Sequence, residues 1–350
     1  MKIVRILVLV VVGFVWVAGC STTVINELYR TRILPDDYRY GDLYRLSHLE
    51  KFKDPKVECP PILVNKPNAT KRISLYIIGD SFTEPQRVDS SDFAVNHFQY
   101  AHWGTLLHLR LDTSYTNIVL LQSVERNARE HFAARIANVL PDTATYISLP
   151  EEARFISRLD HLFASAPTED RLTTLLFEFD PMLKLKEWKS WLNHHFFNRT
   201  DPKVTVSGDR QTIVYHVDTD TTLINSSFIH IPNADIDSLV GILNSNQQYL
   251  KTLGFDQIWY SIIPNKASIL MPEYGTYNRL IQRVGQHPAL HVSTIDVLDD
   301  FRNMGQNPYL KGDSHWSCAG QAVWLEKVNR QLSAVLAQKK SPAPEGGTSL

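Results

Sequence analysis

The sequence predicts an α/β fold with a parallel central sheet. Three short apolar runs rich in β-branched residues, 73–79, 117–122 and 258–263, are typical of buried strands. Helical patterns at 234–253 and 319–336 follow the later strands. Alternating strands and helices favour a parallel sheet covered by helices, with the functional site at the carboxyl ends of the strands.

The remaining elements follow from the same patterns. We expect an amphipathic helix from about Asp92 to Leu107, helices near 151–165, 184–197 and 277–285, a hairpin of 204–206 with 211–217, and a short strand at 291–295.

The predicted α/β domain spans 71–338. Within it, 128–232 is interpreted as an inserted subdomain. Before it, the polar segment 21–70 is expected to form a stalk or wrapping arm, and after it, 339–350 a disordered tail.

The composition is that of an ordinary globular protein. Of 350 residues, 36 are Lys or Arg and 37 are Asp or Glu, so the charges nearly balance and nucleic acid is not an expected partner. His194 and His195 are adjacent and point to different sides of any helix, which makes them a poor metal pair. We therefore expect neither a metal nor a cofactor.

The N-terminus has the pattern of an export signal. Lys2 and Arg5 precede an apolar run, which ends in small residues and then Cys20. This order resembles a bacterial lipoprotein signal, in which Cys20 becomes the acylated first residue of a protein anchored by lipid. Ser21 after the cysteine resembles lipoproteins sent to the outer membrane. An uncleaved inner-membrane signal anchor is the alternative, and both interpretations place 21–350 on the periplasmic face of the envelope.

Two further cysteines, Cys59 and Cys318, remain in a compartment where disulfides persist. A bridge between them and two separate buried thiols are both compatible with the sequence.

Two short motifs carry the candidate chemistry. Ser81 follows Gly79-Asp80 at the end of the first strand, and Asp313 and His315 lie two apart before the last helix. A serine hydroxyl becomes a nucleophile when a base takes its proton, and that base needs a third group to orient it. Each motif alone is also typical of a simple turn, and Asp-x-His of a metal ligand pair. Their joint placement at one sheet edge favours a Ser-His-Asp triad.

Together these motifs resemble the SGNH (GDSL-type) hydrolase superfamily, and most closely its envelope O-acyltransferase branch, which includes alginate O-acetyltransferase-like proteins. The similarity covers roughly 71–127 and 256–330, and softer matches are Val124-Glu125-Arg126 and Pro264-x-Lys266. In the alginate members the Asp-x-His-Trp element precedes the serine, whereas here Ser81 comes first. The resemblance implies a flavodoxin-like three-layer sandwich.

The superfamily's separate glycine and Gly-x-Asn-Asp blocks are not found in this chain. For the oxyanion we therefore expect the Ser81 N–H together with a donor from Gln122, Arg126 or Asn127. Trp316 could orient His315, line an acyl pocket, or pack in the core.

The implied activity is transfer of an acetyl group through Ser81 to an envelope or secreted polysaccharide. A membrane O-acyltransferase is the implied source of the acetyl donor. Two alternatives remain: a carbohydrate esterase or deacetylase that uses the same residues with water, and a non-catalytic glycan-binding lipoprotein of an export complex.

Overall fold

The computed structural model describes residues 2–31, 33–34, 41–54, 59–62, 64, 66–67, 72–141, 166–177 and 179–338. The chain forms two compact units. The sheet unit consists of Val57–Thr145 and Pro202–Leu350, and the helical unit consists of Met1–Lys56 and Tyr146–Asp201. The segment 128–232, expected as one insertion, is therefore divided between the two units. The helix expected at 151–165 and the tail at 339–350 lie outside the described residues.

The sheet unit contains a five-stranded parallel sheet, which confirms the predicted α/β class. In spatial order its strands are β2 (His97–His102), β1 (Ile73–Gly79), β4 (Thr116–Val124), β8 (Gln257–Ile263) and β9 (Ser293–Thr294). Numbered along the chain, this is the 2-1-3-4-5 order of doubly wound sheets. Every residue of β1 and β4 is buried, as expected for central strands of a parallel sheet with apolar runs at their centres.

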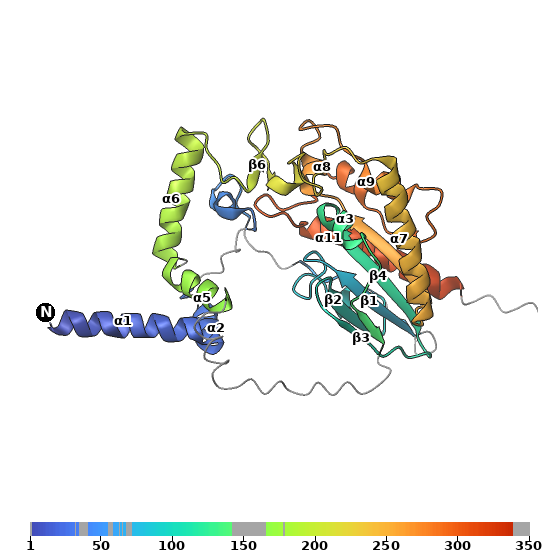
Figure 1. Cartoon of the computed structure of the whole chain (residues 1–350), viewed down its shortest axis with the longest axis horizontal. Helices are drawn as coiled ribbons and strands as arrows, with labels where there is room; N and C mark the ends of the chain where they lie inside the picture. Colours follow the sequence, from blue (N-terminus) through green and yellow to red (C-terminus); the bar gives the residue numbers. More distant parts are fainter. Residues whose placement is uncertain are drawn as a thin grey trace, which may run out of the picture. The chain divides into compact units, whose positions relative to one another are not determined.

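Helices flank this sheet. They are α3 (Glu125–His131), α7 (Asn233–Thr252), α8 (Lys266–Leu270), α9 (Leu280–Gly285), α10 (Leu298–Asn303) and α11 (Cys318–Gln338). Figure 1 shows α7 and α11 on opposite sides of the strands. Leu243 of α7 and Trp324 of α11 belong to one apolar core with the strands, and Trp324 also donates a hydrogen bond to Ser261 Oγ on β8 (3.1 Å).

The helix predicted from Asp92 to Leu107 is wrong. The structure has a 3-10 turn, Ser90–Asp92, and then β2 and a short strand β3 (Leu107–Leu109). Asp89 and Asp92 cap the N-terminus of that turn reciprocally, and the backbone becomes extended at Phe93. Residues His97 to His102 then pair in parallel with Ser74 to Gly79 of β1. The helical spacing of the apolar residues was therefore outweighed by a tertiary contact, pairing with a neighbouring strand.

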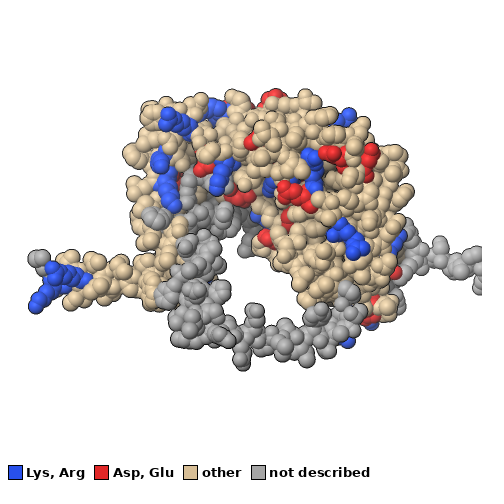
Figure 2. All heavy atoms as spheres, viewed as in Figure 1, with Lys and Arg blue, Asp and Glu red and all other residues tan. Residues whose placement is uncertain are grey.

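Smaller elements complete the sheet unit. β3 pairs in parallel with β5 (Val139–Pro141), while β6 (Val204–Val206) and β7 (Ile213–Tyr215) form the predicted antiparallel hairpin, followed by the 3-10 helix η3 (His216–Asp218). On the face shown in Figure 2, acidic and basic side chains are interspersed over this unit.

The helical unit consists of α1 (Lys2–Cys20), α2 (Thr22–Arg30), the 3-10 helix η1 (Tyr44–His48), α5 (Ala166–Phe177) and α6 (Asp180–Phe196). Ala18, Ile25 and Leu28 form a small core, against which Leu175 and Phe179 pack. Most of α1 is exposed, and it is apolar and long enough to cross a membrane. A helix of this kind at an N-terminus is typical of a signal sequence or a membrane anchor.

Candidate active site

Three side chains from the two predicted motifs form a continuous hydrogen-bonded row in the sheet unit. Ser81 Oγ lies 2.8 Å from Nε2 of His315, and Nδ1 of His315 lies 2.5 Å from Oδ1 of Asp313. In the orientation a triad requires, the Ser81 hydroxyl donates to Nε2 and Asp313 accepts from Nδ1–H. Although more than two hundred residues separate the motifs, the fold places them within direct contact.

The topology of the sheet explains this meeting. The strand order reverses beside β1, so the crevice at the carboxyl ends of β1 and β4 is the place where doubly wound sheets bind ligands. Ser81 follows β1 directly, and α3 begins at Glu125 directly after β4. His315 lies in the turn that precedes α11.

A buried network behind Ser81 holds the turn that presents it. Asp80 Oδ1 accepts from the Phe82 N–H (3.1 Å) and from Gln122 Nε2 (3.0 Å), and Oδ2 accepts from the Val124 N–H (2.6 Å). Gln122 Oε1 in return accepts from the Asp80 N–H and from Thr83 Oγ1, both at 2.9 Å. These bonds connect the ends of β1 and β4, so the backbone around Ser81 is held from both strands.

Gly79 is required by the same network. A side-chain carbon at this position would lie 2.1 Å from Thr83 Oγ1 and 2.7 Å from Gln122 Oε1, closer than non-bonded atoms approach. The glycine before the Asp-Ser pair therefore makes room for the network.

Gln122 is a positioning residue in this arrangement. Its side chain is fully buried, and both its oxygen and its nitrogen bond to groups of the Ser81 turn. The structure thus assigns it a different task from the oxyanion contact considered from the sequence.

The backbone N–H of Ser81 has no hydrogen-bond partner among the described residues, and Ser81 is partly exposed. A backbone donor of this kind beside a nucleophile can accept the charge that develops on a carbonyl oxygen. Asn127 is half-buried on α3, and in the described part of the chain no hydrogen bond holds its side chain.

The environment of Asp313 keeps its carboxyl group ionised beside His315. Burial opposes ionisation of Asp313, but the hydrogen bond and charge interaction with His315 outweigh it and hold the pKa of Asp313 below its usual range. A carboxylate that stays ionised can stabilise the imidazolium formed when His315 takes a proton.

Lys266 holds the turn that carries this pair. It is the first residue of α8 and is almost fully buried, and its Nζ donates to the carbonyl oxygens of Lys311 (2.6 Å) and Asp313 (3.1 Å). The lysine of the Pro264-x-Lys266 match therefore acts on the backbone of the Asp-Ser-His turn.

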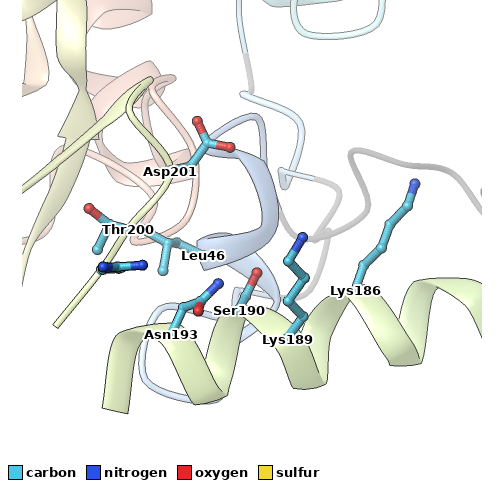
Figure 3. Close-up of a pocket in the computed structure, with 8 residues that line it drawn as sticks. Leu46, Lys186, Lys189, Ser190, Asn193, Thr200 and Asp201 are labelled. Atoms are coloured by element: carbon cyan, nitrogen blue, oxygen red, sulfur yellow. The ribbon is translucent and has the colours of Figure 1, made fainter. Parts of the chain in front are cut away.

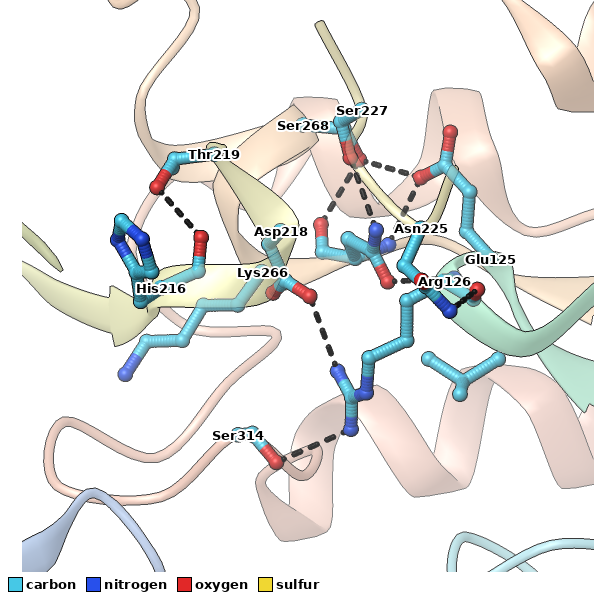
Figure 4. Close-up of polar contacts among 12 residues, drawn as sticks. Glu125, Arg126, His216, Asp218, Thr219, Asn225, Ser227, Lys266, Ser268 and Ser314 are labelled. Carbon is cyan, nitrogen blue, oxygen red and sulfur yellow. Dashed lines mark hydrogen bonds and ion pairs between the residues drawn. The ribbon is translucent and has the colours of Figure 1, made fainter. Parts of the chain in front are cut away.

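Arg126 reaches the same turn from α3. Figure 4 shows its guanidinium between Asp218 and Ser314, with Nη1 3.4 Å from Asp218 Oδ1 and Nη2 3.3 Å from Ser314 Oγ. Its guanidinium also lies over the Tyr215 ring at 5.8 Å. Because Ser314 stands between Asp313 and His315, Arg126 supports the base and its orienting carboxylate.

Glu125 is a buried carboxyl group beside this network. Its Oε2 accepts from the Asn265 N–H (2.9 Å) and from Ser268 Oγ (2.8 Å). Burial raises the pKa of Glu125 to about 7, although these hydrogen bonds oppose the shift. Between pH 4.5 and 7 the folded protein therefore binds more protons at this group than the unfolded chain, so the contribution of Glu125 to stability falls as the pH rises.

We predict that Glu125→Gln removes this pH dependence. From the pKa shift, wild-type protein loses about 3 kcal/mol of unfolding free energy at this group between pH 4.5 and 7, whereas the variant loses none of it. Urea unfolding of both proteins across this range measures the difference. Glu326→Gln, on the exposed face of α11, is the matched control and should leave the pH profile unchanged. A constant difference between wild type and Glu125→Gln over the range contradicts the prediction.

Trp316 packs in the core. It is buried, and the centroid of its ring lies 5.2 Å from that of Phe82 and 5.3 Å from that of Trp324. Its backbone forms an isolated antiparallel β-bridge with Tyr309. Phe82 also contacts the ring of His315 at 4.8 Å, so the aromatic cluster supports the base.

The structure contains the disulfide between Cys59 and Cys318. Cys318 is the first residue of α11, three residues after His315. The bridge therefore ties the chain before β1 to the helix that follows the candidate site.

The sequence alone does not indicate the partners of these residues. The pairs are Asp80 with Gln122, Lys266 with the carbonyl of Asp313, and Arg126 with Ser314. The first pair had a readable signal, because parallel pairing of β1 and β4 places Gln122 beside the end of β1. The other two depend on loop paths that the sequence does not specify.

Comparison with protein-family models, with curated proteins and with solved structures found no match.

Proposed function

We propose that the protein is a serine-dependent O-acetyltransferase of the SGNH type that acts on an envelope or secreted polysaccharide. The observation that carries the proposal is the continuous row from Asp313 through His315 to Ser81, at the carboxyl edge of a parallel sheet. The strand order is also compatible with the flavodoxin-like sandwich of that superfamily.

The proposed reaction has two steps. Ser81 Oγ attacks the acetyl carbonyl of an ester or thioester donor while His315 takes its proton, and the leaving group departs with that proton. The Ser81 N–H stabilises the oxyanion. A sugar hydroxyl then attacks the acetyl-serine while His315 takes the hydroxyl proton, and His315 passes this proton to Ser81 Oγ as the bond between Ser81 and the acetyl group breaks.

The distance of 2.8 Å between Ser81 Oγ and His315 Nε2 supports a catalytic role. A protein that only binds glycan does not require this contact. An esterase would use the same three residues with water as acceptor, so the acceptor is the point to test.

The test uses the full chain with 4-nitrophenyl acetate as donor and alginate or peptidoglycan oligosaccharides as acceptors. We expect mass spectrometry to find an acetyl group on Ser81, which disappears faster when an acceptor is added, with acetylated oligosaccharide as product. Release of free acetate alone, at a rate independent of every acceptor, would indicate an esterase. An unmodified Ser81 together with undiminished turnover would overturn both.

We also propose that Cys20 is the lipid-anchored residue, with the uncleaved α1 anchor as the alternative. Both attach the chain to the membrane at the end of α1.

A further inference from the structure

The outward face of α6 carries an unusual row of large apolar side chains. Leu185, Trp188, Leu192 and Phe196 are spaced by three or four residues and so lie along one side of the helix. The exposed fractions of Leu185, Trp188 and Phe196 are 58%, 61% and 65%. We call these four residues the α6 stripe. A contiguous exposed row of this kind marks an interaction surface.

The opposite side of α6 is already occupied within the helical unit. Leu183 is buried, Glu187 Oε1 lies 2.7 Å from Nδ1 of His48, and the ring of His194 meets Phe52 at 6.0 Å. The helix is therefore held by one face, and the stripe is not needed for its packing.

Basic side chains flank the stripe. Lys184 and Lys189 lie on its two sides by helical spacing, and Figure 2 shows basic side chains over α6 on the face in view. Trp191 is also exposed beside it, with its ring stacked on His195. Exposed tryptophan, leucine and phenylalanine bordered by lysines are typical of helices that lie in the interface of an anionic bilayer.

A polar cavity of about 260 Å³ adjoins this face (Figure 3). The polar residues that line it are Lys186, Lys189, Ser190, Asn193, Arg199, Thr200 and Asp201. Three of these side chains are cationic and one is anionic, and the serine, threonine and asparagine add hydrogen-bond donors. This combination suits a phosphate headgroup beside the apolar stripe.

The position of a bilayer follows from α1. Gly19, at the end of the apolar helix, contacts Leu172 of α5, and Arg171 donates to the Gly19 carbonyl (2.6 Å). α5 leads directly toward α6 in sequence. These Gly19 contacts belong to the form that retains α1. When Cys20 carries lipid, Gly19 is removed and Cys20 is itself the first residue of the helical unit. In both forms the helical unit therefore begins at the membrane surface.

We propose that α6 docks on the bilayer, with the α6 stripe inserted among the lipids and the adjoining cavity holding an anionic phospholipid headgroup. This docking would keep the helical unit on the membrane surface. It is independent of the acyl-transfer chemistry, since none of the residues involved belongs to the sheet unit.

Spin labelling of the full chain in lipid nanodiscs tests the proposal. A nitroxide is placed at Trp188→Cys in a Cys20→Ser background, with Glu326→Cys on α11 as the matched exposed control. In phosphatidylglycerol-containing nanodiscs we expect the label at 188 to be accessible to oxygen and shielded from a water-soluble nickel complex. The label at 326 should show the reverse.

Two results would overturn the proposal. Equal nickel accessibility at both positions would show that the α6 stripe does not enter the bilayer. Shielding at 188 that appears only on addition of oligosaccharide would assign the face to glycan instead. The headgroup site is tested separately with the double variant Lys186→Glu and Lys189→Glu. This variant should increase the nickel accessibility of the label at 188 severalfold. An unchanged accessibility would show that the cavity does not bind a headgroup. Acetyl transfer by the nanodisc samples reports separately on Ser81.

Discussion

Ser81→Ala is expected to abolish acetyl transfer, with a loss in kcat of roughly a thousandfold or more. The variant lacks the atom that attacks the donor. Among the described residues, the Ser81 hydroxyl makes one hydrogen bond, to Nε2 of His315. The measurement is the rate of 4-nitrophenolate release together with acetylation of an oligosaccharide. Removing the nucleophile should eliminate both products.

The control for this variant is Ser333→Ala, which removes a serine hydroxyl from the exposed face of α11. It should retain full activity. Both proteins should unfold at the wild-type urea concentration, because the Ser81 turn is held by Asp80 and Gln122 and not by the hydroxyl. Retained turnover in folded Ser81→Ala would exclude Ser81 as the nucleophile.

Asp313→Asn should lower kcat by about 10⁴ while leaving the fold intact. An asparagine at this position presents an N–H to Nδ1 of His315, which lies 2.5 Å from the present carboxylate. The imidazole then carries its proton on Nε2, the nitrogen that faces Ser81, and cannot accept the hydroxyl proton. The loss should appear in kcat, with little change in KM, because Asp313 acts through His315.

The chain offers a matched control for this change. Asp237 on α7 also pairs with a histidine, His287, at 2.9 Å, but at the exposed surface. Asp237→Asn removes an Asp–His pair without approaching the site, so activity should stay at the wild-type level. If Asp313→Asn were as active as Asp237→Asn, the orientation of His315 by Asp313 would play no part in the reaction.

The central strands and the nature of the site could be read from the sequence because both depend on local patterns. Buried parallel strands are continuous apolar runs, and β1, β4 and β8 were identified at nearly their observed bounds. In parallel α/β sheets the binding and catalytic residues lie at the carboxyl ends of the strands. For this reason Ser81 and His315 could be paired although they lie far apart in the chain.

The edge strand β2 could not be identified in this way. It is only half-buried, so its apolar residues carry no clear period of two, and the pairing with β1 that creates it is a long-range contact. The division of 128–232 between two units was likewise not predicted, because the units are defined by contacts between residues far apart in sequence.

The sequence by itself determined which residues could react: a serine at the end of a buried strand, and an aspartate and a histidine two apart before the last helix. Tertiary structure alone decided which groups hold them in place. Gln122 braces the Ser81 turn, Lys266 holds the carbonyls of the Asp313 turn, and the disulfide closes between Cys59 and Cys318. These contacts join loops whose paths depend on packing against the whole sheet, and packing of that kind leaves no local pattern in the chain.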